Sequence, residues 1–153
     1  MIYTTPMPSD VDYVALNMRM ADIIEVGLGT GRSHIDVLKE SVKMSSQCWV
    51  ACHVAVPLCI FGVVPYPAKA GFGIPWMLGT PDMVKHQRAL VRDGRRYRDR
   101  MQREFHTLVN VVHAGNHTSI QWLKRLGFTL TAPIAVGPTG APFIPFFRCS
   151  TDV

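Results

Sequence analysis

Charged residues are scarce in this chain of 153 residues, at 18%, whereas hydrophobic residues make up 48%. This balance supplies enough apolar surface to offset the entropy lost on folding, which excludes a disordered or fibrous protein. The length suits one compact domain and is too short for two ordinary ones, so we expect residues 1–153 to form a single domain. An excess of 16 Lys and Arg over 11 Asp and Glu indicates acidic partners without naming them.

The chain also lacks an unbroken hydrophobic run. Residues 1–17 contain no basic segment followed by an apolar stretch, so the sequence predicts an intracellular protein without a secretory signal. The most apolar window, 48–66, is interrupted by prolines and a histidine, which favours two buried strands joined at Pro57 over a membrane span. Cysteines are few, and Cys48 and Cys52 would lie about 13 Å apart along a strand, so we expect reduced, mostly packed thiols.

The order of helical and strand patterns predicts an α/β fold with a mixed, largely antiparallel sheet and no internal repeat. Capping residues and apolar spacing predict helices that begin at Ser9, Met20, Ser33, Met83 and Asn116. The second of these is expected to end at Gly27, the fourth to be broken or bent at Gly94 before Arg103, and the last to close at Gly127. The expected strands are Gln47–Val54, Leu58–Val64, Ile74–Leu78, Leu108–His113, Phe128–Thr131 and Phe143–Cys149, with a turn at Gly137–Gly140 and with Pro145 suited to an edge or a bulge.

A glycine-rich segment, Glu25–Gly31, resembles the first motif of S-adenosylmethionine-dependent methyltransferases, in which glycines let the backbone approach the cofactor. That motif must follow a buried strand, and a second strand ending in an acid must come after it. Residues 22–26 have helical spacing instead, and no Asp or Glu occurs between Glu40 and Asp82. The segment is therefore interpreted as a mobile turn between helices, and a methyltransferase remains a distant alternative.

An arginine-rich stretch includes Arg92, Arg95 and Arg96 and is partly neutralised by neighbouring acids. A solvated helical face is the simplest interpretation. Arginines near a helix N-terminus can also hold a phosphate, because backbone N–H groups and the helix dipole add to their charge. Nucleic-acid binding is unlikely on this evidence, since Tyr97 is the one aromatic residue within the cluster.

His113 and His117 have the i,i+4 interval of helical zinc sites. Gly115 and Asn116 lie between them, so His113 should end a strand while His117 begins a helix, and no acid or thiol stands near to complete a ligand set. The sequence therefore predicts no metal site. A loop histidine near a cleft, able to titrate near neutral pH, is the more open possibility.

The tract Asn116–Phe128 resembles the strand-loop-helix-strand segment near the C-terminus of GNAT acyl-CoA-dependent N-acyltransferases. The Asn that begins the helix, the small and aliphatic residues after it and the closing Leu-Gly-Phe all match. The predicted order of elements is similar to that fold over nearly the whole chain. The resemblance implies a GNAT-like fold, a mixed and mostly antiparallel sheet flanked by helices, with acetyl-CoA as a ligand.

A narrower resemblance links the chain to a family of small proteins of short-tailed bacteriophages, which includes an internal virion protein that is also connected with head morphogenesis. It is carried by Arg19 with Asp22 and Glu25, and by the tracts 74–80, 97–110 and 116–128. This resemblance implies a phage origin, with virion or assembly proteins as partners. The implied location is the host cytoplasm during infection and the particle itself.

The sequence departs from the GNAT pattern where that family holds coenzyme A. Those enzymes place the pyrophosphate on backbone N–H groups of a Gln/Arg-x-x-Gly-x-Gly/Ala loop that starts the central helix. The corresponding tract here, Val91–Arg96, has one glycine in register and arginines where small residues are needed. Many members also have a Tyr seven residues after the helix-starting Asn, to protonate the leaving thiolate, and this chain has Leu123 there with Trp122 beside it.

A partial site would still remain if strands 74–78 and 108–113 diverge, as the resemblance implies. Backbone groups near Leu78 would then be free for the acyl-pantetheine arm, next to the helix that Asn116 begins. Arg92, Arg95 or Arg96 would supply charge for the phosphates, and His113 or His117 would be the base. The first hypothesis is a non-catalytic or weakly active GNAT-fold phage protein of the virion or its assembly, and the alternative is an active N-acetyltransferase that transfers acetyl from acetyl-CoA to an amine.

Overall fold

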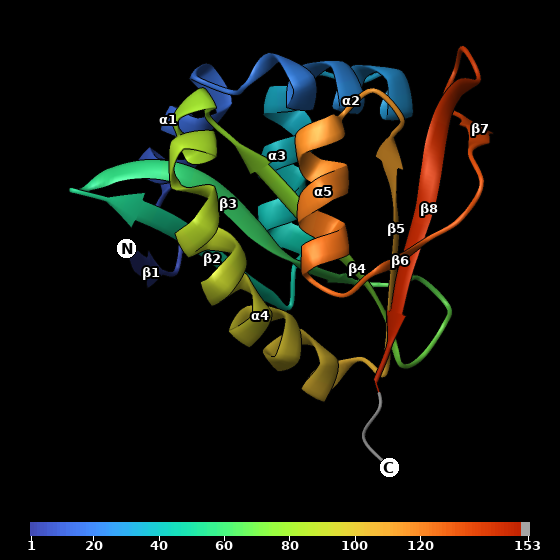
Figure 1. The fold of residues 1–153 in the computed structure, drawn as a ribbon. Helices are drawn as coiled ribbons and strands as arrows, with labels where there is room; N and C mark the ends of the chain where they lie inside the picture. The colour runs from blue at the N-terminus through green and yellow to red at the C-terminus, as the bar shows by residue number, and fades with distance from the viewer. Residues whose placement is uncertain (151–153) are drawn as a thin grey trace.

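The computed structural model describes residues 1–150 as helices packed on both faces of one eight-stranded sheet (Figure 1). The strands are β1 (Ile2–Thr4), β2 (Gln47–His53), β3 (Val56–Pro65), β4 (Phe72–Gly79), β5 (Thr107–His113), β6 (Thr129–Leu130), β7 (Ile134–Val136) and β8 (Ala141–Cys149). The helices are α1 (Pro8–Leu16), α2 (Met20–Thr30), α3 (His34–Met44), α4 (Gln87–Glu104) and α5 (His117–Arg125), with a 3₁₀ helix, η1 (Pro81–His86), before α4.

The strand order is β1-β2-β3-β4-β5-β8-β6, and β7 pairs with β8 beside β6. Every pairing is antiparallel except that of β4 with β5. This confirms the predicted α/β class and the mixed, mostly antiparallel sheet. The apolar window 48–66 forms the β2–β3 hairpin, and none of the helices within residues 1–150 is long and apolar enough to cross a membrane.

Two apolar cores lie on opposite faces of the sheet. One is formed by α4 and α5 against the sheet and includes Tyr97, Met101 and Trp122. The other is formed by α1, α2 and α3 and includes Val14 and Leu38, both fully buried. Figure 1 shows α4 and α5 on the near side of the sheet and α3 behind it. Any cavity that reaches both cores must therefore cross the sheet.

Two of the predicted boundaries are wrong in informative ways. The β2–β3 turn is made by Val54 and Ala55, both with positive φ, whereas Pro57 lies inside β3. α2 continues through Gly27, where a turn was expected, and ends at Gly31, whose φ is 68°. The segment Glu25–Thr30 is thus helical, which excludes both the mobile turn and a methyltransferase loop after a strand.

Two glycines at the C-terminal end of α2 permit close packing, whereas a Cβ on Gly27 would meet no other atom within 4 Å. A Cβ on Gly29 would lie 3.2 Å from the Phe143 ring, and a Cβ on Gly31 would lie 2.9 Å from Pro138. Both contacts are with the β7–β8 hairpin, which lies against the end of α2. Because these neighbours are more than 100 residues away in the chain, the local sequence could not distinguish packing glycines from turn glycines.

The arginine-rich helix also differs from its predicted form. Residues 81–86 form η1, and α4 runs without interruption from Gln87 to Glu104 through Gly94. A Cβ on Gly94 would lie 3.2 Å from Leu126 of the segment after α5, so this glycine too permits close approach. Arg92, Arg95 and Arg96 therefore lie within the helix and not at its N-terminus.

The end of α5 follows the prediction, whereas the place of Pro145 and the strand β7 do not. Gly127 ends the α5 segment with a φ of 85°, as expected for a left-handed closing residue. Pro145 is not at an edge, because β8 pairs with β5 on one side and with β6 and β7 on the other. Its carbonyl accepts from the N–H of Thr131, in the gap between the β6 and β7 pairings, where no ladder needs the N–H that proline lacks.

Candidate functional site

The sheet divides between β4 and β5, as the resemblance implied. The two strands pair only at Phe72 with Thr107 and Gly73 with Leu108. Pro75 follows on β4 and has no N–H to donate, so the ladder cannot continue. The side chain of Asn110 replaces it, with Nδ2 donating to the Pro75 carbonyl at 2.7 Å. Beyond this point the strands form an open fork.

The antiparallel pairing of β3 and β4 fixes which backbone groups face the fork. The Thr80 N–H donates to the Leu58 carbonyl, and the Tyr66 N–H donates to the Phe72 carbonyl. Because N–H groups along one strand alternate in direction, these two bonds fix the orientation of every residue of β4 between them. Leu78, paired with Ile60, therefore directs its N–H toward β3. Met77 directs its N–H and carbonyl toward the fork, so the free backbone expected near Leu78 is that of the preceding residue.

Two carboxylates of α2 close the wide end of the fork. Asp22 Oδ2 accepts the N–H of Gly79, at the end of β4, at 3.0 Å. Glu25 Oε1 accepts the N–H of His113, at the end of β5, at 2.7 Å. The spacing of three residues puts both carboxylates on one face of the helix. α2 thus holds the two diverging strand ends at a fixed separation.

Arg19 and Asn116 join these carboxylates into one buried network. The Arg19 guanidinium forms a salt bridge with Asp22 at 2.9 Å and donates to Asn116 Oδ1 at 2.9 Å and Ser119 Oγ at 2.7 Å. Asn116 Nδ2 donates to Glu25 Oε1 at 3.2 Å and to Asp22 Oδ1 at 3.4 Å. Arg19, Asp22 and Asn116 are all less than 10% exposed, so the network is an interior feature.

Asn116 stands at the N-cap position of α5, as predicted, but its side chain makes no capping hydrogen bond. The expectation that this side chain caps the helix is therefore wrong. Its carbonyl accepts the first helical N–H, from Ile120, while its amide is used by the network. An amide suits this position because it accepts from the guanidinium and donates to the carboxylates at once.

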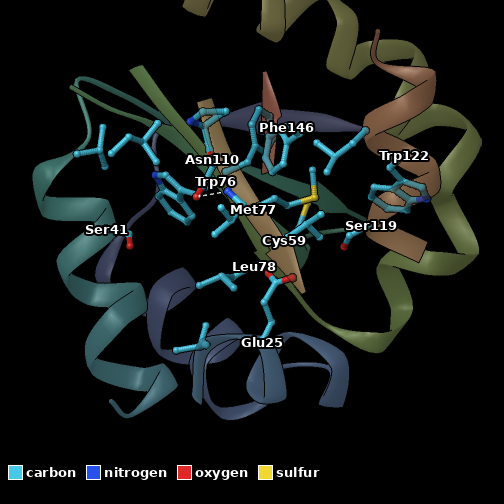
Figure 2. Close-up of a pocket in the computed structure, with 18 of the residues that line it drawn as sticks. Glu25, Ser41, Cys59, Trp76, Met77, Leu78, Asn110, Ser119, Trp122 and Phe146 are labelled. Carbon is cyan, nitrogen blue, oxygen red and sulfur yellow. Dashed lines mark hydrogen bonds between the residues drawn. The ribbon is translucent and has the colours of Figure 1, made fainter. Parts of the chain in front are cut away.

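Glu25 is the most perturbed acid at the fork. Burial raises its pKa to about 7, and the nearby charge of Asp22 acts in the same direction, while the hydrogen bonds from His113 and Asn116 oppose it. Figure 2 shows its side chain pointing from α2 toward Leu78. A carboxyl that is half protonated near pH 7 can take up or release a proton, which is the property expected of a general base.

A cavity of about 460 Å³ surrounds the fork, a size typical of small-molecule sites. Its walls come from both cores, so it crosses the sheet where β4 and β5 separate. Figure 2 shows Met77 and Leu78 of β4 near its centre, with Glu25 below them and Trp122 at the right. The residues that line it on the helices include Val26, Val37, Ser41 and Met44 on one face and Leu90, Tyr97, Ser119 and Leu123 on the other.

The structure places some of the predicted site residues at the cavity and others away from it. Leu78 lines the cavity, and Asn116 lies in the network behind it. His113 contributes its backbone N–H to Glu25, but its ring packs on Phe143, with ring centroids 5.3 Å apart, and does not line the cavity. His117 is exposed at the first position of α5. Neither histidine ring is placed as a base at the fork.

The three candidate phosphate-binding arginines are exposed on α4 and do not line the cavity. Arg92 forms a salt bridge with Asp93, Arg95 donates to the Arg125 carbonyl, and Arg96 lies over the Tyr97 ring. The residues that sequence reasoning missed are Glu25 and Met77. Glu25 had a signal, because it stands at helical spacing from Arg19 and Asp22 in the tract that carried the narrower resemblance.

Solved structures with the same architecture include several acetyltransferases. The ribosomal-protein-alanine N-acetyltransferase of Brucella melitensis matches with a TM-score of 0.72 and 13% identity over 98% of this chain and 100% of its own. The yncA protein of Salmonella typhimurium, solved with its cofactor acetyl-CoA, matches with a TM-score of 0.67 and 16% identity over 100% and 95%. A GNAT-family acetyltransferase of Streptococcus pneumoniae matches with a TM-score of 0.64 and 11% identity, over 97% of this chain and 98% of its own.

These likenesses show that the chain has the GNAT acetyltransferase fold, as the sequence predicted. No protein-family model matches the chain, and no curated protein sequence does. At identities of 11–16% the likeness establishes the fold and leaves the chemistry to the site itself.

Proposed function

We propose that this chain is a GNAT-fold protein of short-tailed bacteriophages that acts in virion morphogenesis or inside the particle, with an acyl-CoA site altered away from catalysis. The observation that carries the proposal is the connection from β4 to α4. GNAT enzymes hold a pyrophosphate on backbone N–H groups at the start of the central helix. Here that connection is η1, which begins with Pro81 and Asp82 and contains no glycine.

An anion at η1 would be poorly held. Pro81 has no N–H to donate, and the carboxylate of Asp82 repels a phosphate. Lys85, the nearby cation, already pairs with Asp82 at 3.0 Å. The acyl end of the ligand fits the fork, because the Met77 N–H faces an open cavity, but the pyrophosphate end does not fit the start of α4.

The groove between α4 and α5 is also crossed by hydrogen bonds. Trp122 Nε1 donates to Gln87 Oε1 at 3.2 Å, and Arg98 donates to the Leu126 carbonyl at 2.6 Å. A long ligand that entered the fork from this face would have to break or avoid these contacts. Leu123, which stands where many GNAT enzymes have a Tyr, lines the same groove and cannot protonate a thiolate.

The phage assignment is supported by the narrower sequence resemblance. Two of the tracts that carry it, Arg19 to Glu25 and 116–128, meet in the buried network at the fork. The proposed partners are other virion or assembly proteins, and the proposed locations are the host cytoplasm during infection and the particle. Mass spectrometry of purified particles should detect the chain if it is packaged.

An active N-acetyltransferase is the second candidate, and the geometry of Glu25 favours it. This carboxyl, with a pKa of about 7, lies at the wide end of the fork, and Met77 directs its N–H into the same fork. In such an enzyme the Met77 N–H would polarise the thioester carbonyl, and Glu25 would take a proton from the amine as it attacks the carbonyl carbon. The C–S bond would then break, and water would protonate the departing thiolate in place of the missing Tyr. This assignment replaces the histidine base expected from the sequence.

Calorimetry with acetyl-CoA and desulfo-CoA separates the two candidates. The altered site predicts no measurable binding of either ligand. Binding with a Kd of about 1 µM, worth about −8 kcal/mol, would contradict the non-catalytic proposal. If that binding is lost in Arg95→Glu or Arg96→Glu, the arginines of α4 have taken over the phosphates. An acetylation assay that depends on Glu25 would then establish the enzyme.

A further inference from the structure

The basic character of the chain is confined to one part of the molecule. Residues 81–125 hold ten of the 16 Lys and Arg and four of the 11 Asp and Glu, so the remaining residues hold six cations and seven acids. The formal net charge of +5 therefore arises from η1, α4 and α5, and the rest of the chain is close to neutral. Composition alone could not show this segregation on the surface.

The cations of α4 lie along one side of the helix. The intervals of Arg88, Arg92, Arg96, Arg100 and Arg103 are three or four residues, which places them on one helical face. All five are exposed. From first to last they extend about 22 Å along the helix axis, a length over which one strand of B-form DNA carries about six phosphates.

α5 extends the same surface. Its exposed residues Lys124 and Arg125 are the last two of the helix, and the Arg95 guanidinium donates to the Arg125 carbonyl at 3.3 Å. Figure 1 shows α4 and α5 beside each other on the same side of the sheet. We define the basic face as the exposed cations of these two helices: Arg88, Arg92, Arg95, Arg96, Arg100, Arg103, Lys124 and Arg125.

Neither the fold nor the fork explains the basic face. None of its eight residues lines the cavity. Arg92 has a salt bridge with Asp93, but its side chain is 72% exposed, and such surface pairs contribute at most about 1 kcal/mol. The exposed Asp99 lies among these arginines and pairs with Arg98 at 2.9 Å, which is not one of the eight. The exposed cations therefore outnumber this acid and repel one another, so their concentration calls for a ligand of opposite charge spread over a similar length.

We propose that the basic face binds the sugar-phosphate backbone of double-stranded nucleic acid without sequence preference. The partner must be extended and polyanionic, because the face is long and carries eight cations. A duplex fits better than a single strand, since the aromatic rings of α4 and α5, Tyr97 and Trp122, are buried and cannot stack on bases. The sequence made nucleic-acid binding unlikely because Tyr97 is the one aromatic residue within the cluster, but contacts to the sugar-phosphate backbone of a duplex need cations and no stacking aromatic side chain.

Fluorescence anisotropy with a labelled DNA duplex of mixed sequence tests the proposal. The purified chain should bind at low salt, and log Kobs should fall linearly with log salt, by about 0.9 for each phosphate neutralised. Arg88→Glu with Arg92→Glu should weaken low-salt binding about tenfold or more and reduce the magnitude of the salt slope by about 2. Lys124→Glu with Arg125→Glu should have a similar effect, which guards against a folding defect in the α4 variant.

The matched control is Lys39→Glu with Lys43→Glu on α3, which makes the same change in net charge on the opposite face of the sheet. Both of these lysines are exposed, and the variant should bind DNA nearly as well as the parent chain. Three results would overturn the proposal: no binding at low salt, equal weakening in the α3 control, or displacement of the duplex by polyglutamate as readily as by unlabelled DNA. The last result would assign the face to acidic protein segments.

Discussion

The titration of Glu25 offers a direct test of the network at the fork. The perturbation is Glu25→Gln, which keeps an oxygen to accept the N–H of His113 and the amide of Asn116 but removes the titrating proton. The pKa of Glu25 is raised from 4.5 to about 7. In the unfolded chain the same carboxyl returns to its ordinary value, so the two states bind different numbers of protons between these limits.

The sign of the change in the free energy of unfolding with pH follows from that difference. Below about pH 4.5 both states hold the proton, and Glu25 contributes no pH dependence. Between about pH 4.5 and 7 the unfolded state loses the proton while the folded state keeps it, so the free energy of unfolding falls as the pH rises. A shift of this size corresponds to about 3 kcal/mol at most. Because Glu25 is only partly buried, about 2 kcal/mol is the expected loss.

Urea unfolding at a series of pH values measures this loss. The free energy of unfolding of Glu25→Gln minus that of the parent chain should rise by about 2 kcal/mol between pH 4.5 and pH 8. Asp12→Asn is the control, because Asp12 is an exposed carboxylate of α1 outside the network, so this variant measures the effect of removing one negative charge alone. If the free energy of unfolding of Glu25→Gln changes with pH no more than that of this control, the Glu25 carboxyl is not perturbed and the proposed base loses its support.

Two further substitutions test the framework around the fork. Gly127→Val should cost about 1–2 kcal/mol and lower Tm by about 2–8 °C, because φ is 85° there, whereas Gly127→Asn should be milder; equal Tm values for all three chains would contradict the left-handed assignment. Arg19→Met should cost about 3–5 kcal/mol in urea unfolding, because Asp22 is left buried without its cation. Adding Asp22→Asn should recover part of this loss, and a single-variant cost below about 1 kcal/mol would show that the pair does not stabilise the fold.

Elements whose ends are set by local chemistry were predictable from the sequence. Ser33 accepts from the N–H of Ile35 at the start of α3, and Gly127 closes the α5 segment, as their residue types indicated. The fork was predictable only through the GNAT resemblance. Its local cause, Pro75 in β4 opposite Asn110 in β5, depends on which strands are neighbours, and no single tract reveals that.

The residues misjudged from the sequence share one property, which is that their partners are distant in the chain. Asn116 has the right type for a cap, yet Arg19 and Glu25, more than 90 positions away, engage its amide. A capping hydrogen bond and a place in the network compete for one side chain. The network prevails because it gives hydrogen bonds to the buried cation of Arg19 and the buried carboxylate of Asp22, which burial shields from solvent. The same competition explains why α2 supplies both carboxylates. A helix that crosses the wide end of a fork can reach the last N–H of each strand, so the width of the fork is set by the spacing of Asp22 and Glu25 on that helix, whatever ligand the cavity holds.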